Sequence, residues 1–120
     1  MIERRWWPPV LWAAFILVMT SIPGAQLPRV NVAGLDKVVH FAFYGVLGWT
    51  ALRAFAPKGG ATRGAVLVVA AIAIFAALDE WHQQFIPGRS METADWMADV
   101  SGAALGLVVA VSARRRAVPS

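Results

Sequence analysis

The chain has 120 residues, of which 58% are hydrophobic and 15% are charged, and its net charge is +4. So few charges cannot cover the surface of a soluble domain of this size, and we interpret 1–120 as a single membrane domain. The basic residues flank hydrophobic stretches, which indicates membrane topology and excludes nucleic acid as the expected partner. The lack of cysteine excludes disulfides, zinc–thiolate sites and a cysteine nucleophile.

The first hydrophobic segment covers about 6–22 and follows two arginines. It opens with two tryptophans, which suit the membrane interface, and two prolines, which suit the first turn of a helix. A signal peptide is the alternative to a membrane span. Because Pro23 makes a poor cleavage site, we favour an uncleaved span that ends at Pro23.

The rest of the chain alternates between polar connections and long hydrophobic segments. In chain order, we predict a loop at 26–35, a span at 36–56, a basic turn at 57–63, a span at 64–85, a polar loop at 86–93 and a span at 94–112. The predicted fold class is therefore all-α, a four-helix transmembrane bundle.

Charge is distributed unevenly between the two ends of this predicted bundle. Four spans place both termini on one side, together with eight of the 11 lysines and arginines. The positive-inside rule therefore predicts cytoplasmic N and C termini, in a multi-pass protein of the bacterial inner (cytoplasmic) membrane. The outer side carries three basic residues and six of the seven acidic residues. These residues are Arg29, Lys37 and Arg89, and Asp36, Asp79, Glu80, Glu92, Asp95 and Asp99.

Three of the predicted helices carry polar residues at helical spacing on this outer side. Residues three or four apart lie on one face of a helix, so each set forms a polar stripe. The sets are Asp36 with His40, Glu80 with Gln83, and Asp95 with Asp99. Charge near lipid is costly and usually functional, so we predict that the three stripes meet in one site.

The site residues divide into two predicted groups. Glu80 or Asp99 could serve as a general base, and His40 as an acid or base. Substrate binding is predicted for residues whose charge or amide could hold an anionic group, namely Asp36, Lys37, Gln83, Arg89 and Asp95.

Each of these residues also has a structural interpretation. Asp36 and Asp95 are favoured helix caps, and His40 could simply bond Asp36. Asp99 is harder to explain in this way, because it lies a full turn inside its helix. It shares a face with Gly102 and Gly106, a GxxxG pattern that lets another helix approach closely. The acids are therefore predicted on the packing face of this helix.

Three stretches resemble the motifs of the VanZ-like membrane proteins. The first is DKVVHF at 36–41, with Tyr44 and a Leu-Gly pair at 47–48. The second is DEWHQQFIPGRS at 79–90, and the third is DWMADVSG at 95–102, followed by Gly106. The resemblance covers nearly the whole chain in the same order. It departs at Asp99, where the family commonly has asparagine, so that a charge is added and an amide donor is lost.

The resemblance implies an envelope-related role at the outer membrane face. The founding member of the family is associated with low-level resistance to teicoplanin, which acts on cell-wall precursors there. The expected partners are membrane lipid and an anionic envelope precursor, to be bound or modified.

Other functions stay open on the residues alone. A divalent metal could use carboxylates and His40, but the chain lacks a paired Glu-x-x-His, and we assign no metal ligand. A non-enzymatic scaffold or partner subunit would use the polar groups to fix helix register. Transport is less favoured, because the acids cluster at one end and leave no path across the membrane.

Overall fold

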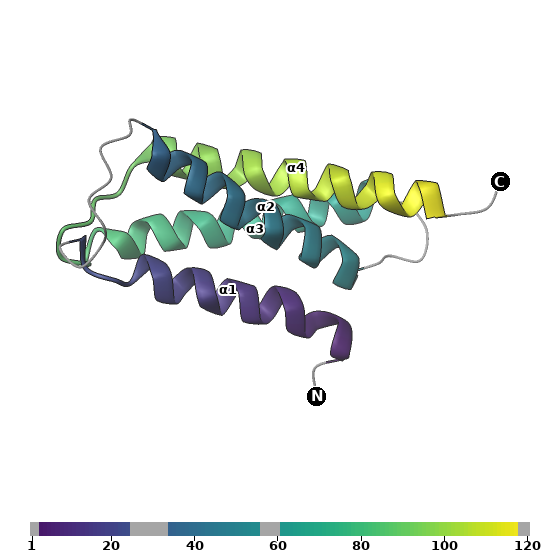
Figure 1. Cartoon of the computed structure of the whole chain (residues 1–120), viewed down its shortest axis with the longest axis horizontal. Coiled ribbons are helices and arrows are strands. Elements are labelled where there is room, and N and C mark those ends of the chain that lie inside the picture. Colours follow the sequence, from purple (N-terminus) through teal and green to yellow (C-terminus); the bar gives the residue numbers. More distant parts are fainter. Residues whose placement is uncertain (1–2, 25–33, 56–60, 118–120) are drawn as a thin grey trace.

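The computed structural model describes residues 3–24, 34–55 and 61–117, and all regular elements within them are helical (Figure 1). The elements are a 3-10 turn η1 (Arg4–Trp6) and the helices α1 (Trp7–Thr20), α2 (Leu35–Phe55), α3 (Ala61–Gln83) and α4 (Thr93–Ala117). The predicted all-α class is thus confirmed.

The boundaries of the helices differ from the predicted spans by a few residues. α3 begins at Ala61, inside the predicted turn, and α4 continues past the predicted end at 112. α3 ends at Gln83 instead of 85, because the next amides bond three residues back, from Phe85 to His82 at 3.1 Å and from Ile86 to Gln83 at 3.1 Å. The predicted loop at 26–35 and turn at 57–63 lie mostly outside the described residues.

α1 is shorter than the other helices. Two prolines occupy its first turn, and it ends at Thr20, three residues before Pro23. Its 14 residues extend about 21 Å, against a hydrocarbon core of about 30 Å. Three other segments are long and apolar enough to cross a membrane, Leu35–Phe55, Arg63–Gln83 and Thr93–Ala113. The chain is a multi-pass membrane protein by this criterion, while the fourth span and the side on which the termini lie stay predictions.

The helices alternate in direction along the chain (Figure 1). The start of α1 and the end of α4 therefore lie at one end of the bundle, and the 84–92 connection lies at the other. α2 and α4 run side by side in the same direction and form the most extensive helix pair. α1 packs on α2 and α3, away from α4. We call the end with the 84–92 connection the polar end.

Glycines bring α2 and α4 into backbone contact. A Cβ at Gly102 would overlap the carbonyl oxygen of Phe41, and one at Gly106 would overlap that of Gly45. Gly48 of α2 likewise faces the carbonyl oxygen of Ala103. The GxxxG pattern of α4 therefore permits close helix packing, as the sequence predicted.

Apolar side chains fill the interior and also cover much of the outside. Ile16, Tyr44, Leu52, Ile72 and Leu107 belong to one buried cluster that joins all four helices. Large aliphatic residues such as Val66, Ile74 and Val108 are more than half exposed. An apolar exterior on this scale suits contact with lipid instead of water.

Candidate functional site

Most of the predicted site residues meet at the polar end of the bundle. α2 and α4 begin there and α3 ends there, so the first turns of two helices face the last turn of a third. Although they are polar or charged, several of these side chains are buried: Asp79, Glu80, Gln83, Asp95 and Asp99. Buried polar groups are costly without partners, so their contacts determine what the site can do.

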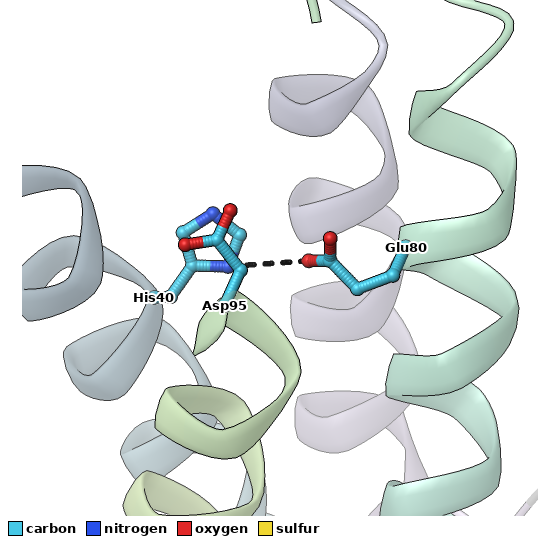
Figure 2. Close-up of side chains that lie close together, drawn as sticks. All are labelled: His40, Glu80 and Asp95. Carbon is cyan, nitrogen blue, oxygen red and sulfur yellow. Dashed lines mark ion pairs between the residues drawn. The ribbon is translucent and has the colours of Figure 1, made fainter. Parts of the chain in front are cut away.

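His40 is the centre of this cluster. Its Nδ1 lies 2.8 Å from Oδ1 of Asp99, whose side chain is fully buried. The same nitrogen lies 3.9 Å from Oε1 of Glu80 on α3. Figure 2 shows the carboxylate of Glu80 directed toward the imidazole of His40, with Asp95 beside it. The three helices thus bring together all three residues that the sequence proposed for acid–base chemistry.

Glu80 is held in place by two donors. Nε2 of Gln83, one turn later on α3, lies 3.2 Å from Oε1 of Glu80. The backbone N–H of Glu92 donates to Oε2 over 3.3 Å. Gln83 therefore positions Glu80, although the sequence placed it among the substrate-binding residues.

Lys37 forms a second group of contacts at the rim. Its Nζ lies 2.7 Å from Oδ2 of Asp36 and 2.9 Å from Oδ1 of Asp95, and it also contacts Oε2 of Glu92. One ammonium thus bridges carboxylates from α2, the 84–92 connection and α4. Because three acids surround it, Lys37 has little positive charge left to attract an anionic ligand.

Asp79 forms a network that the sequence analysis missed. Thr20 Oγ1 of α1 donates to Oδ1 of Asp79 over 2.7 Å, and the hydroxyl of Tyr44 donates to Oδ2 over 3.1 Å. All three residues are almost fully buried. Tyr44 lies one turn below His40 on the same polar stripe, and this position was the signal in the sequence for its contact with a buried acid. Nothing in the sequence indicated that Thr20 would contact Asp79.

Arg89 forms no ion pair with the acidic cluster among the described residues, and its guanidinium binds the end of α1. Its Nε donates to the carbonyl of Ile22 over 3.0 Å, and its Nη2 donates to that of Met19 over 3.0 Å. Nearby, the N–H of Gly24 donates to the carbonyl of Pro87 over 2.8 Å. Burial lowers the pKa of Arg89 from its ordinary value, but a guanidinium stays charged, so the residue acts as a C-terminal cap for α1.

The Arg89→Lys variant is expected to loosen the end of α1. A single ammonium cannot reproduce the two-pronged contact with Met19 and Ile22, and we expect a loss of about 1–3 kcal/mol in unfolding free energy. Hydrogen exchange at 19–24 should increase, whereas the exposed Arg63→Lys should change nothing. Normal exchange combined with lost activity would instead assign Arg89 to ligand binding.

Two groups of side chains have ligand atoms close enough to hold a metal ion. One is His40, Glu80 and Asp95, and the other is Asp36, Glu92 and Asp95. In each group the ligand atoms lie within 4.8 Å of one another. The second group surrounds the Lys37 ammonium.

An apolar groove of about 400 Å³ lies on the same two helices that carry His40 and Asp99. It runs between α2 and α4 and is lined by Phe41, Ala42, Gly45, Val46, Trp49, Leu105, Gly106 and Val109. Phe41 follows His40 in the chain, so the groove and the polar site share the first turns of α2. Gly45 and Gly106, at the close contact of the two helices, are among its lining residues.

Comparison with known proteins identifies one family. Residues 5–114 match the family model described as VanZ/LLP1. Searches of curated proteins and of solved structures give no significant match. The matched range includes the polar cluster, the groove and the whole of α1 through α3.

Proposed function

The chain belongs to the VanZ/LLP1 family, and we propose that this membrane protein binds and modifies a lipid or glycan precursor of the cell envelope. The proposal depends on one observation above all, the meeting of His40, Glu80 and Asp99 at the polar end. An imidazole between two carboxylates can move protons to and from a bound substrate. The sidedness of the basic residues favours the extracytoplasmic face of the inner membrane for this site.

The groove beside the site supports a lipid-linked substrate. A precursor attached to a hydrocarbon chain would place its polar group at His40 and its chain along Phe41, Gly45 and Trp49. Such a molecule needs both a polar site and an apolar groove, because its polar group and its hydrocarbon chain differ in polarity. Soluble glycans would use only the polar half.

Within the site, we assign the roles by contact. Glu80 is the candidate general base, because Gln83 and the N–H of Glu92 fix its carboxylate near His40. His40 would transfer protons, and Asp99 would orient its ring through the 2.8 Å contact. Asp95 lies at the rim, where Lys37 holds its carboxylate in place beside the polar group of the precursor.

Glu80→Gln is expected to lower activity by about 100-fold or more without unfolding the protein, since the amide cannot accept a proton. Glu80→Gln and His40→Gln would each replace the native protein in the bacterium. Lipid-linked cell-wall precursors would then be measured by mass spectrometry, together with teicoplanin susceptibility. Glu3→Gln is the matched control, because Glu3 is exposed and lies at the opposite end of the bundle. Unchanged precursor pools in Glu80→Gln and His40→Gln, at normal protein levels, would contradict the proposed function.

The alternative function is a non-enzymatic scaffold whose polar groups hold the helices in register. The network of Asp79, Thr20 and Tyr44 favours it, because these residues join three helices through hydrogen bonds. Stability separates the two proposals. A scaffold predicts that Glu80→Gln and Asp99→Asn unfold the bundle, whereas a site predicts folded protein without activity.

A further inference from the structure

Negative charge exceeds positive charge in the buried part of the polar end. Lys37 is shared by three carboxylates, and Arg89 binds the carbonyls of α1. Among the described residues, Glu80 and Asp99 therefore have only His40 as an ion-pair partner. Buried carboxylates are stabilised by a proton, by a basic partner or by a metal ion, and here one imidazole is the basic partner of two carboxylates.

The buried carboxylate of Asp99 is a second indication of where a cation would bind. Asp99 is fully buried, and while its Oδ1 contacts His40, its Oδ2 has no hydrogen-bond partner among the residues that the structure describes. A carboxylate oxygen without a donor costs free energy in the interior. The side chain of Asp99 is directed at His40. One ring nitrogen of His40 forms a group of possible metal ligands with carboxylate oxygens of Glu80 and Asp95.

The two groups of possible metal ligands differ in one respect. Asp36, Glu92 and Asp95 surround the ammonium of Lys37, so the protein itself supplies the cation for that group. His40, Glu80 and Asp95 have ligand atoms equally close together, within 4.8 Å, but no lysine or arginine contacts this group except Lys37 at its Asp95 edge, among the described residues. A cation from solution would balance the charge of these carboxylates.

We propose that His40, Glu80 and Asp95 bind one divalent transition-metal cation, and that Asp99 orients His40 toward it. One imidazole and two carboxylates form a ligand set that suits zinc or manganese, whereas calcium prefers oxygen alone. Ligand atoms at about 2.1 Å from one ion lie at most about 4.2 Å apart. The ligand atoms here lie within 4.8 Å of one another, so movements of about half an ångström would bring them to this separation. Three protein ligands leave coordination positions open for water or substrate. With the ion bound, Glu80 and His40 would be its ligands, and a metal-bound water would replace Glu80 as the general base.

The surroundings of these ligands fit a metal site. Metal-binding histidines usually bond a carboxylate through one ring nitrogen and the metal through the other. Asp99 contacts Nδ1 of His40 at 2.8 Å, which leaves Nε2 for the metal ion. Glu80 faces Nδ1 at 3.9 Å, so its side chain would have to turn toward Nε2 to share the ion. Glu80 is fixed by Gln83 and by the N–H of Glu92. A divalent cation here would also make an acidic site attractive to a phosphate group, which the carboxylates alone would repel.

The experiment uses the full-length protein in detergent, stripped with a chelator and titrated with Zn²⁺ and separately with Mn²⁺ by calorimetry. We expect one ion per chain for at least one metal. Glu80→Gln and His40→Gln should weaken binding by at least about 100-fold, and Asp99→Asn by about 10- to 100-fold. Glu92→Gln, a matched carboxylate loss in the Lys37 group, should leave the affinity unchanged.

X-ray absorption on the loaded wild-type protein provides a measurement that does not depend on the folding of any variant. We expect one imidazole nitrogen with oxygen ligands. The proposal is overturned if neither metal binds, if no nitrogen ligand is found, or if Glu92→Gln weakens binding as much as Glu80→Gln. Metal binding does not require the envelope role, so a bound ion with normal precursor pools in site variants would contradict only the proposed function.

Discussion

Replacing Gly106 with alanine is expected to destabilise the bundle by about 3 kcal/mol, at the upper end of the usual cost of overpacking. The new Cβ would overlap the carbonyl oxygen of Gly45, a backbone atom that cannot rotate away. α2 and α4 would have to separate, and this pair is the most extensive in the bundle. The unfolding free energy in detergent, measured by denaturant titration and circular dichroism, tests this expectation.

Gly45→Ala is the matched control on the opposite helix. A Cβ at Gly45 would lie 3.4 Å from the carbonyl oxygen of Gly102, which is an ordinary van der Waals contact. Alanine also favours helix over glycine by about 1 kcal/mol, so this variant should be as stable as the wild type or slightly more so. Equal stability of the Gly106→Ala and Gly45→Ala variants would contradict the close α2–α4 packing.

Removing both hydroxyl donors from Asp79 is expected to cost about 3–5 kcal/mol, as when a buried charge loses its partner. Thr20→Val removes the 2.7 Å contact and Tyr44→Phe removes the 3.1 Å contact, and each alone should cost about 1–3 kcal/mol. The double variant leaves the carboxylate buried without these donors. Unfolding titrations of the two single variants and the double variant measure these costs.

Rescue by a third substitution makes this prediction specific. Adding Asp79→Leu to the double variant replaces all three polar groups by apolar ones of similar size, which is nearly neutral in comparable networks. Most of the lost stability should therefore return. If the double variant is as stable as the wild type, or if Asp79→Leu lowers its stability further, the network does not hold α1, α2 and α3 together.

The sequence predicted the polar stripes of α2 and α4, because helical spacing determines which residues share a face. His40 follows Asp36 by one turn and Asp99 follows Asp95 by one turn, so both stripes could be assigned before any packing was known. The contact of His40 with Asp99 instead of Asp36 was not predictable in this way. It depends on which helices are neighbours, and α2 packs against α4.

Two residues that the sequence analysis misplaced or missed, Arg89 and Thr20, bond to other helices. Arg89 resembled a cation for an anionic ligand, yet its guanidinium binds the carbonyls of Met19 and Ile22. Thr20 resembled the ordinary end of a helix, yet it donates to Asp79, 59 positions later in the chain. A residue's type and spacing do not reveal a partner so far away.

The order of hydrophobic and polar residues was enough to specify helices, a membrane environment and a polar end, since each depends on local composition and periodicity. The partners of the buried groups were settled by packing. Glycines let α2 and α4 meet at the backbone, and this contact places His40 beside Asp99 and near Glu80. Such proximity arises from helix–helix geometry, to which every helix contributes, and no single segment of the chain encodes it.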